Sequence, residues 1–330
     1  MRTRRFACAA AIAAAIAAFI PDGASAQGAS GVITIVNPYA AGGGTDAVAR
    51  LVAERMSRTL GRSVIVENVA GAGGTIANDR VARSTPDGST ILINHTGLLS
   101  APSLFTNLRY DTKTAFEPIG LVNSAPLLLV GKKSIPGSGP KDFVAWMKEQ
   151  GSKATFAHGG VGTNSQLCPV LIGNVLGFKP VFAAYRGSGP ALTDLIAGQI
   201  DLLCDQATSA LPHVQSGLIH GIAVTAKTRL EQAPNIPTAA EAGLSDLVYT
   251  FWHGLYVPKG TPKEVVATLN AALRAAVSDP GVREKLKGLG TDTFPEDRMS
   301  PEAHAAIFAE DLERITKLVE SSGIKASEAK

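Results

Sequence analysis

Two glycine loops are the residues of this chain best suited to bind a ligand. The first covers residues 37–46 (Asn-Pro-Tyr-Ala-Ala-Gly-Gly-Gly-Thr-Asp) and the second covers residues 71–75 (Gly-Ala-Gly-Gly-Thr). Each follows an apolar run and precedes an amphipathic stretch. Glycine leaves main-chain N–H groups uncovered, and a helix start adds unpaired donors with a partial positive charge. Side by side, the loops predict a socket for a small carboxylate or phosphate that requires no Arg or Lys.

A third loop, at residues 159–165 (Gly-Gly-Val-Gly-Thr-Asn-Ser), leads into a predicted helix with Thr163 or Asn164 as its cap. Its donors would take a second polar group of the ligand, or the loop is an ordinary capped connection. In residues 185–190, Ser188 would cap the next helix. Arg186 would either pair with a carboxylate or be solvated.

Two acidic residues near these loops also have two interpretations each. Asp46 suits the first turn of a helix but repels a bound anion. It therefore either holds the first loop in shape or contacts the ligand, if need be through water. Asp205 ends a predicted buried strand, where open α/β sheets bind ligands. It would accept a hydrogen bond from a ligand amine or hydroxyl, or cap the helix that follows.

The residues give little support for an enzyme. A dinucleotide fingerprint would use Gly42, Gly44 and Ala47, with Glu67 on the ribose. A predicted export signal argues against it, because free nicotinamide cofactors are mainly intracellular. Ser188 does not form a nucleophile elbow, since the preceding glycine of that motif is missing.

The histidines lack the spacing of a helical metal pair, so neither a metal nor another cofactor is predicted. His95 and His158 lie at predicted strand ends and would edge the site. Surface or core positions are expected for the other histidines, His213, His220, His253 and His304.

The N-terminus has the pattern of a signal peptide. A basic head precedes an apolar run too short for a membrane span, and the small residues at 24–26 predict cleavage before Gln27. Cys8 offers a lipoprotein alternative, but it lies at the front of the apolar run rather than at its end. Without residues 1–26 the chain keeps 28 basic and 27 acidic residues, a net charge of +1. That charge excludes an electrostatic case for nucleic acid.

Alternating strand-like and helix-like segments predict an α/β fold with mainly parallel sheets. Strands are expected at 32–36, 64–67, 90–94, 119–122, 127–131, 154–157, 181–184, 201–204, 221–225 and 249–257. Helices are expected at 45–60, 75–83, 141–150, 164–177, 189–198, 207–216, 262–278, 280–289 and 301–322. For the helix at 262, Thr261 and Glu264 have the spacing of a capping box.

No simple linker divides the chain, so we expect two interleaved lobes joined by two crossing strands that act as a hinge. Residues 27–127 and 250–330 would form the first lobe and residues 128–249 the second. In the second lobe, Cys168 lies early in a predicted helix and Cys204 in a predicted strand. A disulfide is possible in an exported protein, but two buried thiols are the favoured interpretation.

Nearly the whole mature chain resembles the periplasmic solute-binding proteins of tripartite tricarboxylate transporters, often called the Bug family. No single motif is specific, but their order and spacing together are. The matching stretches are residues 38–39, 42–46, 66–68, 71–74, 86–88, 103–105, 160–163, 185–188, 190–195, 198–201, 237–238 and 241–243.

The resemblance implies a two-lobed Venus-flytrap fold with two mixed, mainly parallel sheets and a two-strand hinge. It implies capture of a small organic acid without catalysis, and delivery to large and small membrane subunits of a cation-coupled transporter. A periplasmic monomer is expected, and a dicarboxylate or an aromatic acid is the expected ligand. An exported sensor subunit that presents the acid to a membrane kinase is the alternative.

The resemblance also implies which residues bind the ligand. In the first lobe they are Tyr39, Ala41, Gly42, Gly43, Asp46, Gly73 and Gly74, with Thr96 and Gly97 at the variable end of the pocket. In the second lobe they are Thr163, Asn164, Ser165, Tyr185, Ser188 and Asp205. The chain departs from the family at Ala40, Ala41, Gln166 and Arg186, so the substrate does not transfer. Leu98 and Leu99 would suit a longer aliphatic or aromatic acid.

Overall fold

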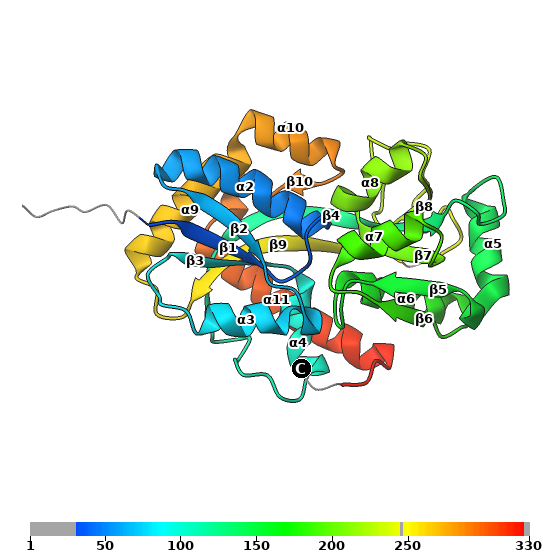
Figure 1. Cartoon of the computed structure of the whole chain (residues 1–330), viewed down its shortest axis with the longest axis horizontal. Helices are drawn as coiled ribbons and strands as arrows, with labels where there is room; N and C mark the ends of the chain where they lie inside the picture. Colours follow the sequence, from blue (N-terminus) through cyan, green and yellow to red (C-terminus); the bar gives the residue numbers. More distant parts are fainter. Residues whose placement is uncertain (1–30, 245–246, 327–330) are drawn as a thin grey trace, which may run out of the picture. The chain divides into compact units, whose positions relative to one another are not determined.

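Short β-branched runs alternate with amphipathic helices along this chain, and they fold into one mixed sheet with helices packed on it (Figure 1). The structure is a computed structural model, and it describes residues 31–244 and 247–326. The predicted signal peptide and its cleavage site lie outside the described residues. No helix of the described part of the chain is long and apolar enough to cross a membrane.

The strands of the described residues form a ten-stranded sheet in the order β2-β1-β3-β9-β4-β7-β5-β6, and β8 and β10 also pair with β4. The strands are β1 (Ile33–Asn37), β2 (Val64–Asn68), β3 (Thr90–Asn94), β4 (Phe116–Lys132), β5 (Thr155–His158), β6 (Val181–Ala184), β7 (Leu202–Gln206), β8 (Ile219–Val224), β9 (Thr250–Pro258) and β10 (Asp292–Thr293).

The helices follow the predicted pattern closely. They are α2 (Gly44–Leu60), α3 (Thr75–Ala82), α4 (Thr96–Leu104), α5 (Pro140–Gln150), α6 (Asn164–Leu176), α7 (Ser188–Ile196), α8 (Ala207–Gln215), α9 (Lys263–Ser278), α10 (Pro280–Gly288) and α11 (Pro301–Ser322). Short 3₁₀ turns occupy Ala72–Gly74, Gly151–Lys153 and Glu296–Arg298.

The long strand β4 connects the two ends of the sheet. Its residues 116–126 pair antiparallel with β9, and its residues 127–132 pair antiparallel with β7 and β8. The strands expected at 119–122 and 127–131 are one continuous strand, so β4 joins the two predicted sheets into one path. The sheet is also less parallel than predicted, since parallel pairing is confined to β1, β2, β3 and to β5, β6, β7.

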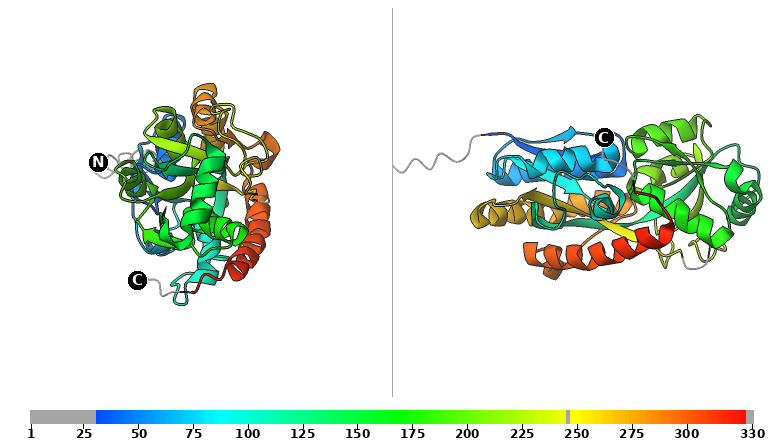
Figure 2. Two further views of the ribbon diagram at one scale, coloured as in Figure 1. Left: turned by 90° about the vertical axis from the view of Figure 1, so that its right-hand side faces the viewer. Right: turned by 90° about the horizontal axis from the view of Figure 1, so that it is seen from below.

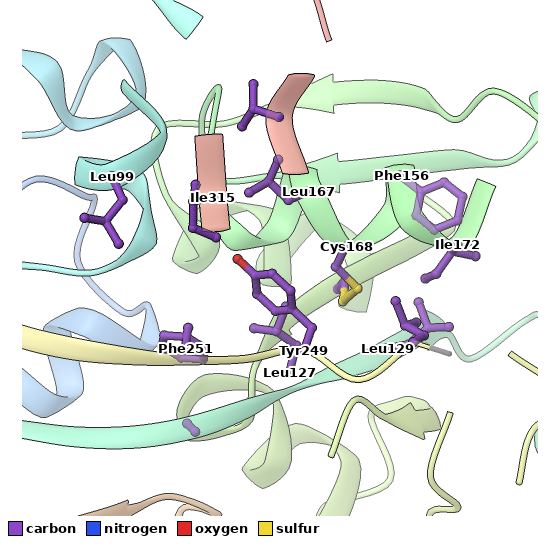
Figure 3. Close-up of a cluster of buried hydrophobic side chains, with 14 of the residues drawn as sticks. Leu99, Leu127, Leu129, Phe156, Leu167, Cys168, Ile172, Tyr249, Phe251 and Ile315 are labelled. Atoms are coloured by element: carbon purple, nitrogen blue, oxygen red, sulfur yellow. A yellow bond between two sulfur atoms is a disulfide. The ribbon is translucent and has the colours of Figure 1, made fainter. Parts of the chain in front are cut away.

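Three hydrophobic clusters hold the helices on the sheet. One packs α2, α9 and α10 on one face of the β1–β3 region, and another packs α7 and α8 against β4, β5, β7 and β8. The largest runs under α3, α4 and α11 and continues into α5 and α6. In this cluster Leu127, Phe156, Leu167 and Ile315 surround the Cys168–Cys204 disulfide and Tyr249 (Figure 3).

Helix α11 spans this largest cluster. It contacts α4, β4 and α6, so the C-terminal helix lies along elements from both ends of the sheet (Figure 2). Its side chains Leu312, Ile315 and Val319 are buried at successive turns, as a helix with one apolar face requires.

Three local predictions were wrong. Helix α4 was missed because Gly97 and Pro102 lie inside it; burial of Leu98, Leu99 and Leu104 compensates for their poor helix propensity. The capping box at Thr261 does not form, because that hydroxyl donates to the Pro258 carbonyl and Pro262 is the cap residue. Cys168 and Cys204 form a disulfide rather than two thiols, because α6 packs on β7 with their Cα atoms 6.2 Å apart.

Candidate functional site

Five helices begin at one small cavity: α4, whose cap residue His95 accepts from the Gly97 amide, and four others that have no side-chain cap. Their cap residues are Gly43 for α2, Thr163 for α6, Gly187 for α7 and Gln206 for α8, and all four line the cavity. The first N–H groups of these four helices therefore lack the side-chain oxygen that usually satisfies one of them. Their partial positive charges converge on the same space.

The first glycine loop connects β1 to α2 and is shaped by Asp46. The Asp46 carboxylate accepts hydrogen bonds from the Gly42 amide (3.1 Å) and Asn68 Nδ2 (3.0 Å), and it pairs with Arg50 at 3.0 Å. Burial raises the pKa of this carboxyl, but the hydrogen bonds and the Arg50 charge outweigh burial and leave the pKa below its usual range. Asp46 thus holds the loop in shape, one of its two predicted roles.

The second glycine loop lies beside the third rather than on the cavity. Gly71, Gly73 and Gly74 all have positive φ values, which only glycine adopts without strain. A Cβ at Gly73 would collide with the Val161 carbonyl of the third loop. Gly73 therefore meets the third loop directly, whereas Gly74 lies against Pro38 and Tyr39, and neither glycine lines the cavity in this conformation.

The third loop is held by its own hydroxyls. Ser165 Oγ accepts from the Gly159 amide at 2.8 Å, and Thr163 Oγ1 donates to the Gly160 carbonyl at 2.7 Å. The expected side-chain cap by Thr163 or Asn164 is absent, since Thr163 bonds back into the loop. Asn164 Oδ1 instead accepts from the Tyr249 hydroxyl at 2.9 Å.

Asp205 lies behind Ser188 on the opposite wall. Its carboxylate accepts from the Ser188 hydroxyl at 2.5 Å and from the Ser209 hydroxyl at 2.6 Å. Burial raises the pKa of Asp205, and these hydroxyl donors oppose that rise without cancelling it. Ser188 is the first residue of α7 rather than its cap, because its side chain is committed to Asp205.

The walls of the cavity touch each other. The Ala40 amide donates to the Arg186 carbonyl at 2.8 Å, and a Cβ at Gly189 would collide with the Ala41 carbonyl. The cavity measures about 20 Å³, room for roughly one water molecule. The site is therefore closed in this conformation.

The predicted residues divide into two groups. Those that line the cavity are Tyr39, Gly43, Asp46, Thr163, Asn164, Ser165, Ser188 and Asp205. Those outside its lining are Ala41, Gly42, Gly73, Gly74, Thr96, Gly97 and Tyr185. The Tyr185 hydroxyl points elsewhere, since it donates to Asp194 at 2.6 Å.

Five other lining residues lie in the predicted loops but were not named as ligand contacts, namely Ala40, Gly44, Thr45, Gly159 and Gly187, and two more, Leu127 and Gln206, were missed altogether. Gly44 is glycine for a steric reason, because a Cβ there would collide with Thr208 and Gln206. These contacts join residues more than 150 positions apart, so no local pattern points to them.

Among the histidines, His95 lines the cavity as expected and stacks on Tyr39 with ring centroids 4.8 Å apart. Burial lowers the pKa of His95 to about 3, so the ring is neutral. His158 is buried beside the third loop and accepts from the Gly160 amide, but it does not line the cavity. The described residues contain no group of three or more potential metal ligands.

Four other residues that the sequence analysis considered for ligand binding do not line the cavity. The Glu67 carboxylate, proposed for a ribose, forms two hydrogen bonds with Arg80 at 2.6 and 2.7 Å. Arg186 is exposed and forms no ion pair with another described residue. Leu98 and Leu99 are buried in the core and do not line the cavity in this conformation, so their role toward a longer ligand stays a prediction.

Comparison with known proteins supplies the family. Residues 48–324 match the family described as "Tripartite tricarboxylate transporter family receptor". The chain belongs to this family. It is 40% identical over 294 residues to a protein encoded in the TAR-I ttuE–ttuC′ intergenic region of Agrobacterium vitis, covering 89% of this chain and 85% of that one.

Solved structures of solute-binding proteins share the fold. The periplasmic binding protein BugD has a TM-score of 0.86 at 38% identity, covering 90% of this receptor and 99% of BugD. MatC from Rhodopseudomonas palustris with bound malate has a TM-score of 0.83 at 36% identity, covering 87% and 98%. An R. palustris protein with adipate has a TM-score of 0.84 at 29% identity, covering 89% and 98%. The family and the fold are those of solute-binding proteins rather than enzymes.

Proposed function

We propose that this receptor is a periplasmic binding protein that captures a small organic carboxylate, a dicarboxylate or an aromatic acid, between two lobes. It then delivers the acid to the large and small membrane subunits of a cation-coupled transporter. The two lobes are residues 27–127 with 250–330, and residues 128–249. The signal peptide is cleaved near Ala26 and Gln27, and the mature protein acts as a monomer.

The observation that carries the proposal is the convergence of four helix N-termini on one cavity. Helices α2, α6, α7 and α8 each direct uncapped N–H groups toward it. No Lys or Arg side chain lines it. Such a site attracts one carboxylate through main-chain donors and dipoles. Malate in MatC and adipate in the R. palustris protein are carboxylates of this kind.

Ligand entry requires the walls to separate, because a cavity of about 20 Å³ holds no organic acid. We assign this motion to β4 and β9, which pair with each other where β4 changes partners between Pro126 and Leu127. The open form would expose both walls, and closure would add the contacts of the second wall. The acid would stabilise the closed form by its difference in affinity for the two forms.

Isothermal titration calorimetry with malate, adipate, succinate and benzoate tests the proposal. The native mature protein should bind at least one of these acids with a stoichiometry of one. Gly43→Val should abolish binding, because a β-branched side chain would cover the α2 amides. Gly139→Val is the matched control, since Gly139 is also an uncapped glycine at a helix start and its Cβ would meet open space.

The proposal is wrong if no carboxylate binds, or if Gly43→Val binds as tightly as the native protein. Loss of binding in Gly139→Val as well would mean that valine at any helix start disturbs the fold, and Asp205→Ala then decides. That variant should weaken binding while it leaves the far-ultraviolet circular dichroism unchanged.

A further inference from the structure

A buried row of hydrogen bonds leads from the cavity into the paired strands β4 and β9. Gln206 Nε2 lies 3.1 Å from Thr45 Oγ1, and Thr45 Oγ1 lies 3.1 Å from His253 Nε2. His253 Nδ1 lies 2.9 Å from Asn123 Oδ1, and Asn123 Nδ2 lies 2.6 Å from Thr291 Oγ1. All of these residues are at least nine-tenths buried.

The donor and the acceptor of each hydrogen bond in this row can be assigned by starting from its far end, at Thr291. Thr291 Oγ1 lies 2.8 Å from the Ser124 main-chain carbonyl, which only accepts, so the Thr291 hydroxyl donates there. The Thr291 oxygen therefore accepts from the Asn123 amide nitrogen. That leaves the Asn123 carbonyl oxygen to accept, and His253 must carry its proton on Nδ1.

His253 is neutral, so its Nε2 accepts. Burial, and to a lesser extent the neighbouring His95, lower the pKa of His253 well below its ordinary value. The rings of His95 and Phe251 lie edge-on to His253 at centroid distances of 5.6 and 5.3 Å. With Nε2 as an acceptor, the single proton of the Thr45 hydroxyl is committed to His253.

Thr45 therefore presents only lone pairs toward the cavity that it lines. One lone pair accepts from Gln206 in the closed conformation, and a hydroxyl oxygen has a second. The neighbouring Asp205 carboxylate also accepts. This part of the wall consequently repels a bare carboxylate and favours a group that carries a proton.

We infer that His253 and Asn123 are positioning residues that fix Thr45 as an acceptor, so that the site selects carboxylic acids bearing a hydroxyl or amino group over otherwise identical acids without one. This inference rests on the proposed function and narrows its ligand class. The α2 amides would take the carboxylate, while Thr45 would take the donor group.

Matched pairs of acids that differ by one hydroxyl test the selectivity: malate with succinate, lactate with propionate, and mandelate with phenylacetate. For at least one pair, the native protein should bind the hydroxy acid at least tenfold more tightly by calorimetry. Thr45→Val, which has the same shape, should reduce that ratio to below threefold by weakening only the hydroxy acid. Thr45→Ser keeps the hydroxyl and should keep the ratio.

Variants of His253 and Asn123 test whether these two residues position Thr45. His253→Phe and Asn123→Ala should also reduce the ratio, although neither side chain lines the cavity. Thr112→Val is the matched control, because Thr112 is a buried threonine remote from the cavity and its hydroxyl has no partner. That control should keep the native ratio.

A second measurement does not depend on any ligand. Nitrogen-15 NMR of the imidazoles should show His253 as the neutral Nδ1–H tautomer from pH 5 to pH 8, with the signal assigned by its loss in His253→Phe. An Nε2–H tautomer or an imidazolium would overturn the inference. Equal binding within every acid pair would also overturn it, whereas no binding of any acid would overturn the proposed function itself.

Discussion

Cys168 and Cys204 form a disulfide that joins the helix carrying Asn164 and Ser165 to the strand that ends beside Asp205. Both cysteines are fully buried in the largest hydrophobic cluster (Figure 3). The bridge therefore fixes two elements of the cavity wall relative to each other. It also closes a loop of 36 residues in the unfolded chain.

Removing this disulfide should lower both stability and affinity. The double variant Cys168→Ala with Cys204→Ala should lose about 3–4 kcal/mol of unfolding free energy, from the entropy gained by the open unfolded loop. The carboxylate that the native protein binds should bind several-fold more weakly, because α6 and β7 become free to shift. Urea unfolding and calorimetry measure both effects. Unchanged affinity would show that packing alone places Asn164 and Asp205.

Asp46 should make the protein acid-sensitive. Its folded pKa is lowered, so its stabilisation is complete above the ordinary carboxyl pKa of about 3.9 and is lost as pH falls through the lower folded value. At pH 7, Asp46→Asn should cost about 1–2 kcal/mol, the usual cost of losing a hydrogen-bonded charge. Denaturant unfolding at pH 7 and below pH 4 should show that the gap in unfolding free energy between the native protein and the variant becomes smaller in acid. A gap that stays constant would exclude the carboxylate as its cause.

Asp205 should have the opposite pH dependence. Burial raises the pKa of Asp205 in the folded protein, so its ionisation opposes folding. The free energy of unfolding therefore suffers a loss that begins as pH rises past the ordinary carboxyl pKa of about 3.9. Asp205→Asn should abolish this loss and should weaken ligand binding, because the amide accepts fewer hydrogen bonds from Ser188 and Ser209. Melting temperatures of both proteins between pH 4 and pH 7 measure the effect. Parallel curves would contradict it.

Gly44→Ala should weaken closure of the site on its ligand without lowering the stability of the fold. A Cβ at Gly44 would collide with Thr208 and Gln206 in the closed conformation, so affinity should fall at least tenfold. The unfolding free energy of the ligand-free protein should hold or rise by a few tenths of a kcal/mol, roughly, since alanine favours helix over glycine. Gly288→Ala in α10 is the matched control, because nothing lies near its Cβ position. Equal affinity in Gly44→Ala and Gly288→Ala would mean that the wall at Gln206 does not close on α2.

The sequence predicted the elements well where one residue pattern decides the outcome. Helix α2 begins at Gly44, one residue before the predicted start at 45, and α11 spans 301–322 as predicted from its one apolar face. Helix α4 was not predicted, because Gly97 and Pro102 have poor helix propensity and burial in the core stabilises the helix instead. β4 was split in two because Asn123, Ser124 and Pro126 interrupt its apolar run, although all three pair with β9.

The site was harder to predict because long-range contacts assemble it. Glycine loops and Ser188 were visible as donors, but the sequence does not show that Tyr185 turns to Asp194. Thr45, Gln206 and His253 come together across 161 and 208 positions. Their partners depend on the pairing of β4 with β9, which no local spacing encodes.

The most direct test of the account is the distance between spin labels on the two proposed lobes, measured by pulsed electron resonance. Thr59 on α2 and Gln199 after α7 are exposed and suit replacement by labelled cysteine. Closure of two lobes predicts a long or broad distance distribution without ligand, and a single shorter distance when a carboxylate that binds by calorimetry is added. The same distance distribution with and without that bound carboxylate would contradict capture by closure of the two lobes.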